Sequence, residues 1–291
     1  MAHRLSRREL FPVLPRILPT KVTCVVTHID GEILGLADTG SIAVPGRTIR
    51  EGFRQLGLAQ KPAARSAPAY SRFVNRRIGR ALAAVCWALG LSPNAVTVLS
   101  AAFTFSAIAL LALAPLGWPL GLAVGTGLLV GYALDSADGQ VARLTGRSSP
   151  AGEWLDHVID AAKASALPLA LTVGLYRNGA IAEPWLLVPI AASVVNAVLF
   201  FSMILTEQLR RQYSRVPVAD HALTRATSRG WLRSVLVLPM DYGFLCLSFL
   251  LLGVLPAFLV LYTAIVVATA AFLLLAAGKW FSELRTVEVR A

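Results

Sequence analysis

Apolar residues along this chain gather into long runs that short polar stretches separate. Several runs approach the length of about 20 residues that an α-helix needs to cross a bilayer. The predicted spans lie at about 95–114, 117–136, 155–175, 184–205, 235–253 and 256–277. Runs of this length are typical of helices rather than strands, so the predicted fold class is all-α. We expect a polytopic membrane protein with six transmembrane helices.

A different pattern precedes the first span. Between residues 70 and 91, arginines such as Arg72 and Arg76 interleave with apolar residues such as Phe73. A helix with one basic side and one apolar side is suited to an anionic membrane surface. The pattern therefore predicts an N-terminal amphipathic juxtamembrane helix. This helix ends before Ser92, which caps the first span together with the proline that follows it.

The first 66 residues show neither pattern. Residues 21–44 carry β-branched clusters split by Asp30-Gly31 and by Asp38-Thr39-Gly40, which fits a small hairpin. Two strands alone are marginally stable in water, so an extended tail is the alternative. We therefore divide the chain into a cytoplasmic N-terminal tail of unknown role, residues 1–66, and a membrane domain, residues 67–291.

Composition and charge agree with a membrane protein. The chain has 291 residues, of which 56% are hydrophobic and 15% are charged, and its mean hydropathy is +0.65. Of the 27 lysines and arginines, 14 precede the first span, whereas the loops on the opposite side hold only Arg177. By the positive-inside rule, both termini and the loop after the second span face the cytoplasm, with the plasma (inner) membrane as the expected location. Topology thus explains the net charge of +11, and nucleic-acid binding is not needed.

Four aspartates lie at the predicted cytoplasmic ends of the second and third spans. Asp135 and Asp138 are three residues apart, and Asp156 and Asp160 are four apart, so each pair shares a helix face. An acid in a span costs about 2.5–3.5 kcal/mol at a helix centre, and four converging acids repel one another unless a cation lies among them. Oxygen ligands of this kind suit Mg²⁺ or Mn²⁺. Simple solvation of the acids at the interface is the alternative.

Other residue types in this stretch narrow the chemistry. His157 is predicted to point about 100° away from Asp156, which argues against a softer metal site. Gly139 and Gly152 let a ligand approach the backbone closely. Arg143 offers a planar fork that suits phosphate oxygens, although it also fits the topological excess of basic residues. Metal ions, an arginine and small residues at a membrane mouth together suit a diphosphate substrate.

These residues resemble the signature of the CDP-alcohol phosphotransferase (CDP-alcohol phosphatidyltransferase) family. The signature reads here as Asp135-x2-Asp138-Gly139-x2-Ala142-Arg143-x8-Gly152-x3-Asp156-x3-Asp160, with every defined position occupied. The six-span layout and the Ser92-Pro93-Asn94…Thr97 start of the first span are also similar to the family. Residues 1–66 are not covered by the resemblance.

The resemblance implies an enzyme of phospholipid biosynthesis. It implies transfer of a phosphoalcohol group from a CDP-alcohol to an acceptor hydroxyl, with release of CMP. The expected phosphoalcohol group is phosphatidyl. The resemblance also implies a homodimer, Mg²⁺ or Mn²⁺ as cofactor, and Asp160 as the general base. The metal ligands that it implies are Asp135, Asp138, Asp156 and Asp160. The CDP-alcohol site that it implies is lined by Asp135, Gly139, Ala142, Arg143 and Gly152.

The acceptor is less well defined. The resemblance allows CDP-diacylglycerol or a CDP-choline-type donor, and inositol phosphate, glycerol phosphate or serine as acceptor. Basic side chains suit the acceptors that carry a phosphate. The candidate acceptor residues are Lys163, Arg210, Arg211 and Asp241. An alternative class is an intramembrane prenyltransferase with an aspartate-rich Mg²⁺–diphosphate site, but no second acidic motif follows Asp160. A metal transporter would instead place its acids near the bilayer midplane.

Overall fold

The computed structural model describes residues 47–58, 68–213 and 241–285. Within these ranges every regular element is a helix, so the predicted all-α class is confirmed for the described part of the chain. The predicted hairpin in residues 21–44 lies outside the described residues. The division of the chain at residue 66 stays a prediction.

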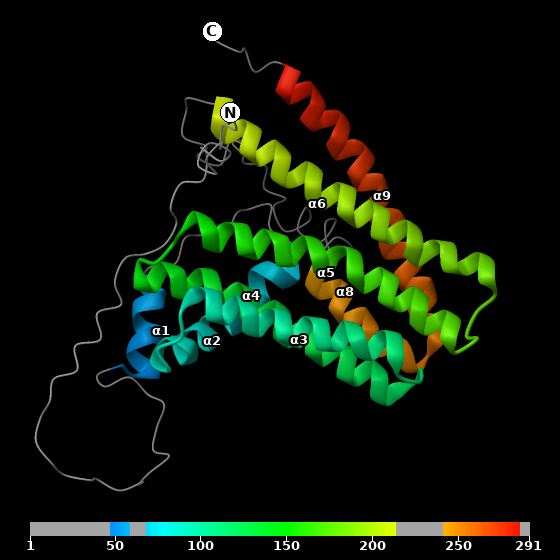
Figure 1. Ribbon diagram of the computed structural model, residues 1–291, viewed down its shortest axis with the longest axis horizontal. Helices are drawn as coiled ribbons and strands as arrows, with labels where there is room; N and C mark the ends of the chain where they lie inside the picture. The colour runs from blue at the N-terminus through cyan, green and yellow to red at the C-terminus, as the bar shows by residue number, and fades with distance from the viewer. Residues whose placement is uncertain (1–46, 59–67, 214–240, 286–291) are drawn as a thin grey trace, which may run out of the picture. The chain divides into compact units, whose positions relative to one another are not determined.

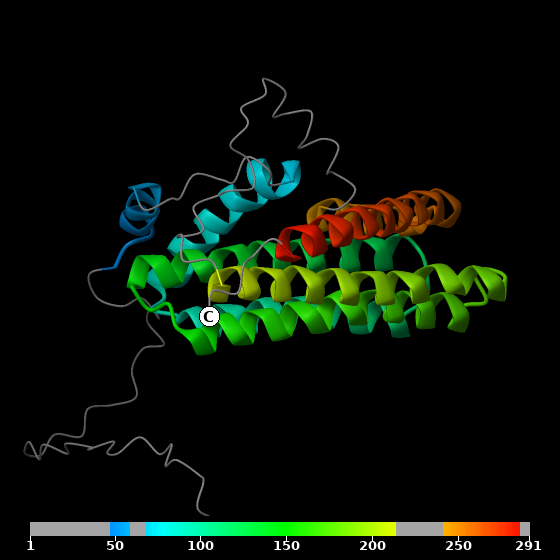
Figure 2. The ribbon, with the colours of Figure 1, turned by 90° about the horizontal axis from the view of Figure 1, so that it is seen from above.

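Among the described residues, five helical segments are long and apolar enough to cross a membrane. A helix rises about 1.5 Å per residue, so each of these segments can reach across a hydrocarbon core of about 30 Å. They are α3 (Pro93–Leu113), α4 (Trp118–Thr145), α5 (Pro150–Arg177), α6 (Leu187–Tyr213, preceded by the 3₁₀ turn η2, Glu183–Leu186) and α9 (Leu255–Arg285). Figures 1 and 2 show α3, α4 and α5 running alongside one another, with α6 between α5 and α9.

The sixth predicted span, residues 235–253, is not confirmed. Its first six residues lie outside the described part, and the remainder forms α8 (Tyr242–Ser248) and the 3₁₀ turn η5 (Phe249–Gly253). These elements have seven and five residues. At about 1.5 Å per residue they cover roughly 18 Å, which is less than the hydrocarbon core requires. The described part of this apolar run folds into two short elements that pack against α4.

Local sequence signals fix the helix ends that surround the site. Ser92 accepts a 3.2 Å hydrogen bond from the amide of Ala95 and so caps α3, with Pro93 in the first turn. Ser149 caps α5 in the same way, through a 3.1 Å hydrogen bond from the amide of Gly152. Gly146 ends α4 with φ of +63°, a left-handed conformation that glycine adopts readily. The loop between α4 and α5 is therefore short.

Small residues allow α3, α4 and α5 to pack closely. The hydroxyl of Ser100 on α3 donates a 2.8 Å hydrogen bond to the carbonyl of Gly131 on α4. A Cβ atom on Gly131 would overlap the Thr104 hydroxyl, and one on Gly174 of α5 would overlap the carbonyl oxygen of Leu111. Close backbone approach of this kind is a common way to join helices in a membrane. It holds the two helices that carry the aspartates against the same neighbour.

A proline within α5 is compensated by side chains of α6. Pro168 has no amide proton, so it leaves the carbonyl of Ala164 without its usual helical donor. The Asn196 side chain of α6 donates to that carbonyl at 3.4 Å, and Ser193 donates to the carbonyl of Ser165 at 3.0 Å. These contacts fasten α5 to α6 just beyond the turn that carries Lys163.

In the part of the chain that the structure describes before the first span, three helical elements are present: α1 (Ile49–Leu58), the π-helical turn η1 (Ser71–Asn75) and α2 (Arg76–Ala88). Figures 1 and 2 both show α1 next to α2. Arg80 of α2 donates a 2.6 Å hydrogen bond to the carbonyl of Phe53, and its guanidinium lies 3.9 Å from the centroid of the Phe53 ring. This double contact holds α1 on α2.

The other faces of α2 either pack on α4 or are exposed, which accounts for the amphipathic pattern of its sequence. One face packs on α4, where a Cβ atom on Gly79 would lie within 3 Å of the Ser136 side chain. Ile78 and the neighbouring Phe73 of η1 are exposed. A helix is therefore present where the sequence predicts one, and its position on a membrane surface stays a prediction.

Candidate active site

Carboxylates from α4 and α5 meet at the end of these helices where α4 stops and α5 starts. Asp135 and Asp138 belong to α4, and Asp156 and Asp160 belong to α5. One carboxylate oxygen from each of Asp135, Asp138 and Asp156 lies within 4.8 Å of the other two. Three side chains that are 21 residues apart at most thus converge on one position, because a short loop folds the two helices against each other.

The donor set of this cluster fits a hard divalent cation. Its three ligand atoms are all carboxylate oxygens, which Mg²⁺ and Mn²⁺ prefer. Asp138 is 8% exposed, and Asp135 and Asp156 are half-buried. Charged carboxylates that leave water and face one another are unfavourable unless a positive charge compensates them. A cation held by these three side chains satisfies that requirement.

A threonine of α3 orients one of these carboxylates. The hydroxyl of Thr97 lies 2.7 Å from Oδ2 of Asp138, to which it donates a hydrogen bond. The amide of Gly139 donates to Oδ1 of the same carboxylate. Both oxygens of Asp138 therefore accept a hydrogen bond, one from its own helix and one from α3. Thr97 stands in the family-like start of the first span, but sequence reasoning gave it no role in the site.

Lys163 lies among the acids rather than beside them. Its ammonium nitrogen is 2.7 Å from Oδ1 of Asp135 and 2.5 Å from Oδ1 of Asp160, although only the contact with Asp135 has hydrogen-bond geometry. Lys163 is 6% exposed. It therefore ion-pairs with one aspartate from each helix. The sequence suggested Lys163 as an acceptor-binding residue, and the structure shows its charge engaged by these two carboxylates.

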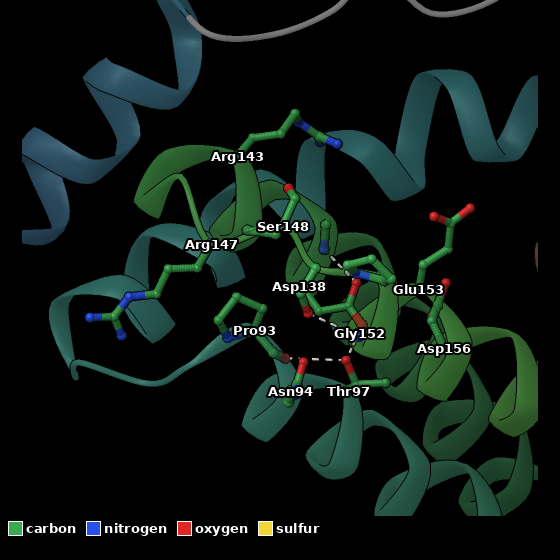
Figure 3. A pocket seen from close by; sticks show the side chains of 14 residues that line it. Pro93, Asn94, Thr97, Asp138, Arg143, Arg147, Ser148, Gly152, Glu153 and Asp156 are labelled. Atoms are coloured by element: carbon green, nitrogen blue, oxygen red, sulfur yellow. Dashed lines mark hydrogen bonds between the residues drawn. The ribbon is translucent and has the colours of Figure 1, made fainter. Parts of the chain in front are cut away.

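A pocket of about 460 Å³ opens beside the cluster, and Figure 3 shows its lining. Residues of the sequence motif that line it are Asp138, Gly139, Ala142, Arg143, Gly152 and Asp156. A Cβ atom on Gly152 would lie 3.1 Å from Oδ1 of Asn94 and 3.3 Å from the Ser149 hydroxyl. A larger residue at position 152 would therefore intrude between these two polar side chains.

The pocket is also lined by residues that were not predicted from the sequence. Asn94, Ser149 and Glu153 line it, and each sits in the first turn of α3 or beside the start of α5. The signal that could have found the first two was present, because each belongs to a serine–proline helix start that must lie near the loop. Arg147 also lines the pocket, but in Figure 3 its guanidinium points away from Asp138.

His157 lies closer to the acids than expected. Its ring nitrogens are 4.0 Å from Oδ2 of Asp156 and 3.8 Å from Oε1 of Glu153. A nitrogen of His157 and oxygens of Asp156 and Asp160 also lie within 4.8 Å of one another. His157 is therefore within reach of the acids, and the prediction that it is not a metal ligand stays a prediction.

The two arginines proposed for the acceptor belong to a second pocket. This pocket has a volume of about 290 Å³, lies between α5, α6 and α9, and is lined in part by Glu153, His157, Arg210, Arg211 and Trp280. Arg211 pairs with Glu153 at 2.7 Å and with Glu207 at 3.1 Å, and Arg210 pairs with Glu283. Since Glu153 lines both pockets, the second pocket adjoins the first.

Asp241 does not line either of these two pockets. It is 1% exposed and caps α8 through a 3.0 Å hydrogen bond from the amide of Gly243 to Oδ1. Its Oδ2 accepts a 3.0 Å hydrogen bond from the amide of Ser71. Both oxygens thus hold backbone groups, and this arrangement supports a structural role for Asp241 rather than acceptor binding.

Fold and site together define a polytopic, helical membrane protein with a carboxylate-lined pocket that suits a cation and a phosphate-bearing ligand. A family model described as CDP-alcohol phosphatidyltransferase matches residues 90–276. This range holds the five long helices almost entirely and covers more than half of the chain, so the chain belongs to the CDP-alcohol phosphatidyltransferase family. The resemblance stated from the motif is therefore confirmed. A search of curated proteins finds no match to this chain.

Membership of this family makes the protein a membrane-bound transferase of phosphorus-containing groups in phospholipid biosynthesis. The family uses a divalent metal ion, and the carboxylate cluster offers a place for one. A CDP-alcohol donor and a hydroxyl acceptor also follow from membership. The matched range begins after α1 and α2, so these two helices lie outside it.

Proposed function

We propose that this protein transfers a phosphatidyl group from CDP-diacylglycerol to the hydroxyl of a small acceptor and releases CMP. The single observation that carries the proposal is the convergence of Asp135, Asp138 and Asp156 beside a pocket that Gly139, Ala142, Arg143 and Gly152 of the motif line. The pocket's volume of about 460 Å³ falls within the usual range for small-molecule sites.

The donor's diphosphate is proposed to bind between α4 and α5. Asp135, Asp138 and Asp156 would hold Mg²⁺ or Mn²⁺, and the bound ion would neutralise charge that develops on the phosphate oxygens. Arg143 lines the same pocket and contributes a guanidinium for the phosphates. The absence of a side chain at Gly139 and Gly152 lets the nucleotide approach the backbone, with Ala142 as a further small wall.

Asp160 is proposed as the general base. It accepts the proton of the acceptor hydroxyl, and the hydroxyl oxygen forms a bond to the β-phosphorus of the donor. The bond from this phosphorus to the oxygen of CMP breaks, and its electron pair leaves with CMP. Oδ1 of Asp160 contacts the Lys163 ammonium, so the proton is assigned to Oδ2. The neighbouring Lys163 ammonium favours the ionised form of Asp160, which is the form that accepts a proton.

Inositol phosphate and glycerol phosphate are the proposed acceptors, with the pocket between α5, α6 and α9 as their binding place. Arg210 and Arg211 line that pocket, and each already pairs with a glutamate. An anionic acceptor would therefore bind by exchanging places with these carboxylates. We further propose a homodimer, as the family resemblance implies. The distribution of basic residues suggests a protein of the plasma membrane with both termini and the site cytoplasmic.

The test is CMP release by the purified full-length protein in lipid nanodiscs. CDP-diacylglycerol and other CDP-alcohols are offered with a panel of hydroxyl acceptors, and lipid products are separated by headgroup. We expect CMP release that EDTA abolishes, that Mg²⁺ or Mn²⁺ restores, and that Asp156→Asn removes. No CMP from any combination, together with consumption of prenyl diphosphates, would establish the prenyltransferase alternative instead.

A further inference from the structure

The position of Lys163 between two helices carries an inference beyond the proposed reaction. Its ammonium nitrogen lies 2.7 Å from Oδ1 of Asp135 on α4 and 2.5 Å from Oδ1 of Asp160 on α5. Asp160 is three residues before Lys163 in the same helix, whereas Asp135 is 28 residues away. The lysine therefore joins the two acidic pairs of the motif.

This nitrogen occupies the place that a shared metal ion would need. Mg²⁺ lies about 2.0–2.1 Å from its oxygen ligands, so an ion bridging these two Oδ1 atoms would sit almost where Nζ of Lys163 sits. Steric overlap excludes both from that place at once. Repulsion between an ammonium and a divalent ion at such a distance adds to the exclusion, because a half-buried site screens charge less than water does.

Burial explains why the lysine stays there. Lys163 is 6% exposed, and its side chain is 8% exposed against 20% for Asp135 and 26% for Asp160. Removing an ammonium from water is costly unless oppositely charged groups pair with it. Two carboxylates supply that pairing, and moving the lysine away would leave all three groups uncompensated.

We propose that Lys163 is a built-in cation of the active site that limits the protein to one divalent ion. The ammonium takes the position between Asp135 and Asp160, and the single ion takes the position among Asp135, Asp138 and Asp156. Lys163 is then a positioning residue that fixes Asp160 relative to the metal site. The inference rests on the proposed function, because the metal site comes from it.

Counting bound Mn²⁺ tests the inference. Full-length protein in nanodiscs is titrated with MnCl₂ without substrate, and free Mn²⁺ is followed by electron paramagnetic resonance. We expect one bound ion per chain in the wild type. Lys163→Met keeps the side chain's length and removes its charge, so we expect two ions per chain, with the dipolar broadening of a close Mn²⁺ pair. Lys279→Met, at an exposed lysine of α9, is the control and should bind one ion.

Each outcome of the Mn²⁺ titration either supports or overturns the inference. Two ions in the wild type overturn the inference, while EDTA-sensitive CMP release in the same sample shows that the proposed function stands. One ion in both wild type and Lys163→Met also overturns it, and an increased Michaelis constant for the acceptor alone would return Lys163 to acceptor binding. If the wild type binds no ion, the proposed metal site does not exist, and the proposed function fails as well. If Lys163→Met does not elute as a folded protein, Lys163→Gln replaces it, and the wild-type count still separates one ion from two.

Discussion

The hydroxyl of Thr97 donates a 2.7 Å hydrogen bond to Oδ2 of Asp138, so that α3 orients a carboxylate carried by α4. Thr97 is 5% exposed and Asp138 is 8% exposed, so water does not readily replace this bond. A carboxylate oriented in this way presents its remaining lone pairs to the cluster with Asp135 and Asp156. The position of a metal ion would therefore depend on a helix that contributes no ligand.

Replacing Thr97 with valine tests this dependence. Valine has the same shape but no hydroxyl, so Asp138 loses a donor and gains freedom to rotate. Loss of such a supporting hydrogen bond typically weakens metal affinity by about 10–100-fold. Mn²⁺ titration of the purified protein measures the change. Thr97→Ser should retain most of the affinity, and Thr104→Val, a buried threonine elsewhere on α3, should leave it unchanged. Wild-type affinity in Thr97→Val would show that the hydroxyl does not matter.

Asparagine substitutions should separate metal ligands from the base. Asp138→Asn removes a charge from the metal cluster, so metal and CDP-alcohol binding should weaken together. Asp160→Asn should keep much of the donor affinity and lose turnover by about 10²–10⁴-fold, as expected for a removed general base. Calorimetric donor affinity and CMP release, measured on both variants, make the comparison. An equal loss of donor binding in the two would make Asp160 a ligand first.

The contact between α5 and α3 predicts a large effect from a single methyl group. A Cβ atom on Gly174 would overlap the backbone carbonyl of Leu111, which cannot rotate away. We expect Gly174→Ala to destabilise the protein by about 1–3 kcal/mol through overpacking. The readout is the thermal unfolding midpoint in detergent. Gly278→Ala on α9 is the matched control, because a Cβ atom there meets no atom within 4 Å. Equal midpoints for the two variants would contradict the packing that the structure shows.

Cysteine labelling tests the orientation of the helices. Asn178 follows α5 at the end opposite to the site, and Ser282 lies near the end of α9, where Arg210 of α6 pairs with Glu283. Single cysteines at these two exposed positions should react with a membrane-impermeant maleimide from opposite sides of the membrane. Reaction of both from one side would contradict an odd number of membrane crossings between Asn178 and Ser282.

The native cysteines interfere little with that experiment. Cys86 and Cys246 are both buried, and burial raises the pKa of the Cys86 thiol, so little of the reactive thiolate is present. Removing all native cysteines, including Cys24, supplies the clean background.

The sequence predicted the carboxylate cluster well because its determinants are local. Spacings of three and four residues place Asp135 with Asp138 and Asp156 with Asp160, and the serine–proline start of α5 limits the loop between the pairs. The pairing of Lys163 with Asp160 follows from the same periodicity. Its pairing with Asp135 does not, because that contact depends on how α4 and α5 pack.

The remaining differences also come from tertiary contacts. Hydropathy detected the apolar run at 235–253, but it could not show that Asp241 starts a new helix by capping α8. Charge alone suggested Arg211 as a free cation for an acceptor. The glutamates that pair with it include Glu153, which is 58 residues away. No pattern along the chain reports a partner at that separation.

The proline in α5 has a consequence for how the enzyme meets membranes of different thickness. Asn196 and Ser193 of α6 fasten α5 between Lys163 and Pro168, so the inner part of the helix is held independently of its outer part. A helix bends most easily at such a proline. The part of α5 beyond Pro168 also packs on α3 at Gly174, so we expect little bending at the proline when bilayer thickness changes. Turnover in nanodiscs should therefore vary little with acyl-chain length in the wild type, and more steeply in Asn196→Ala, which removes one of the hydrogen bonds beside the proline.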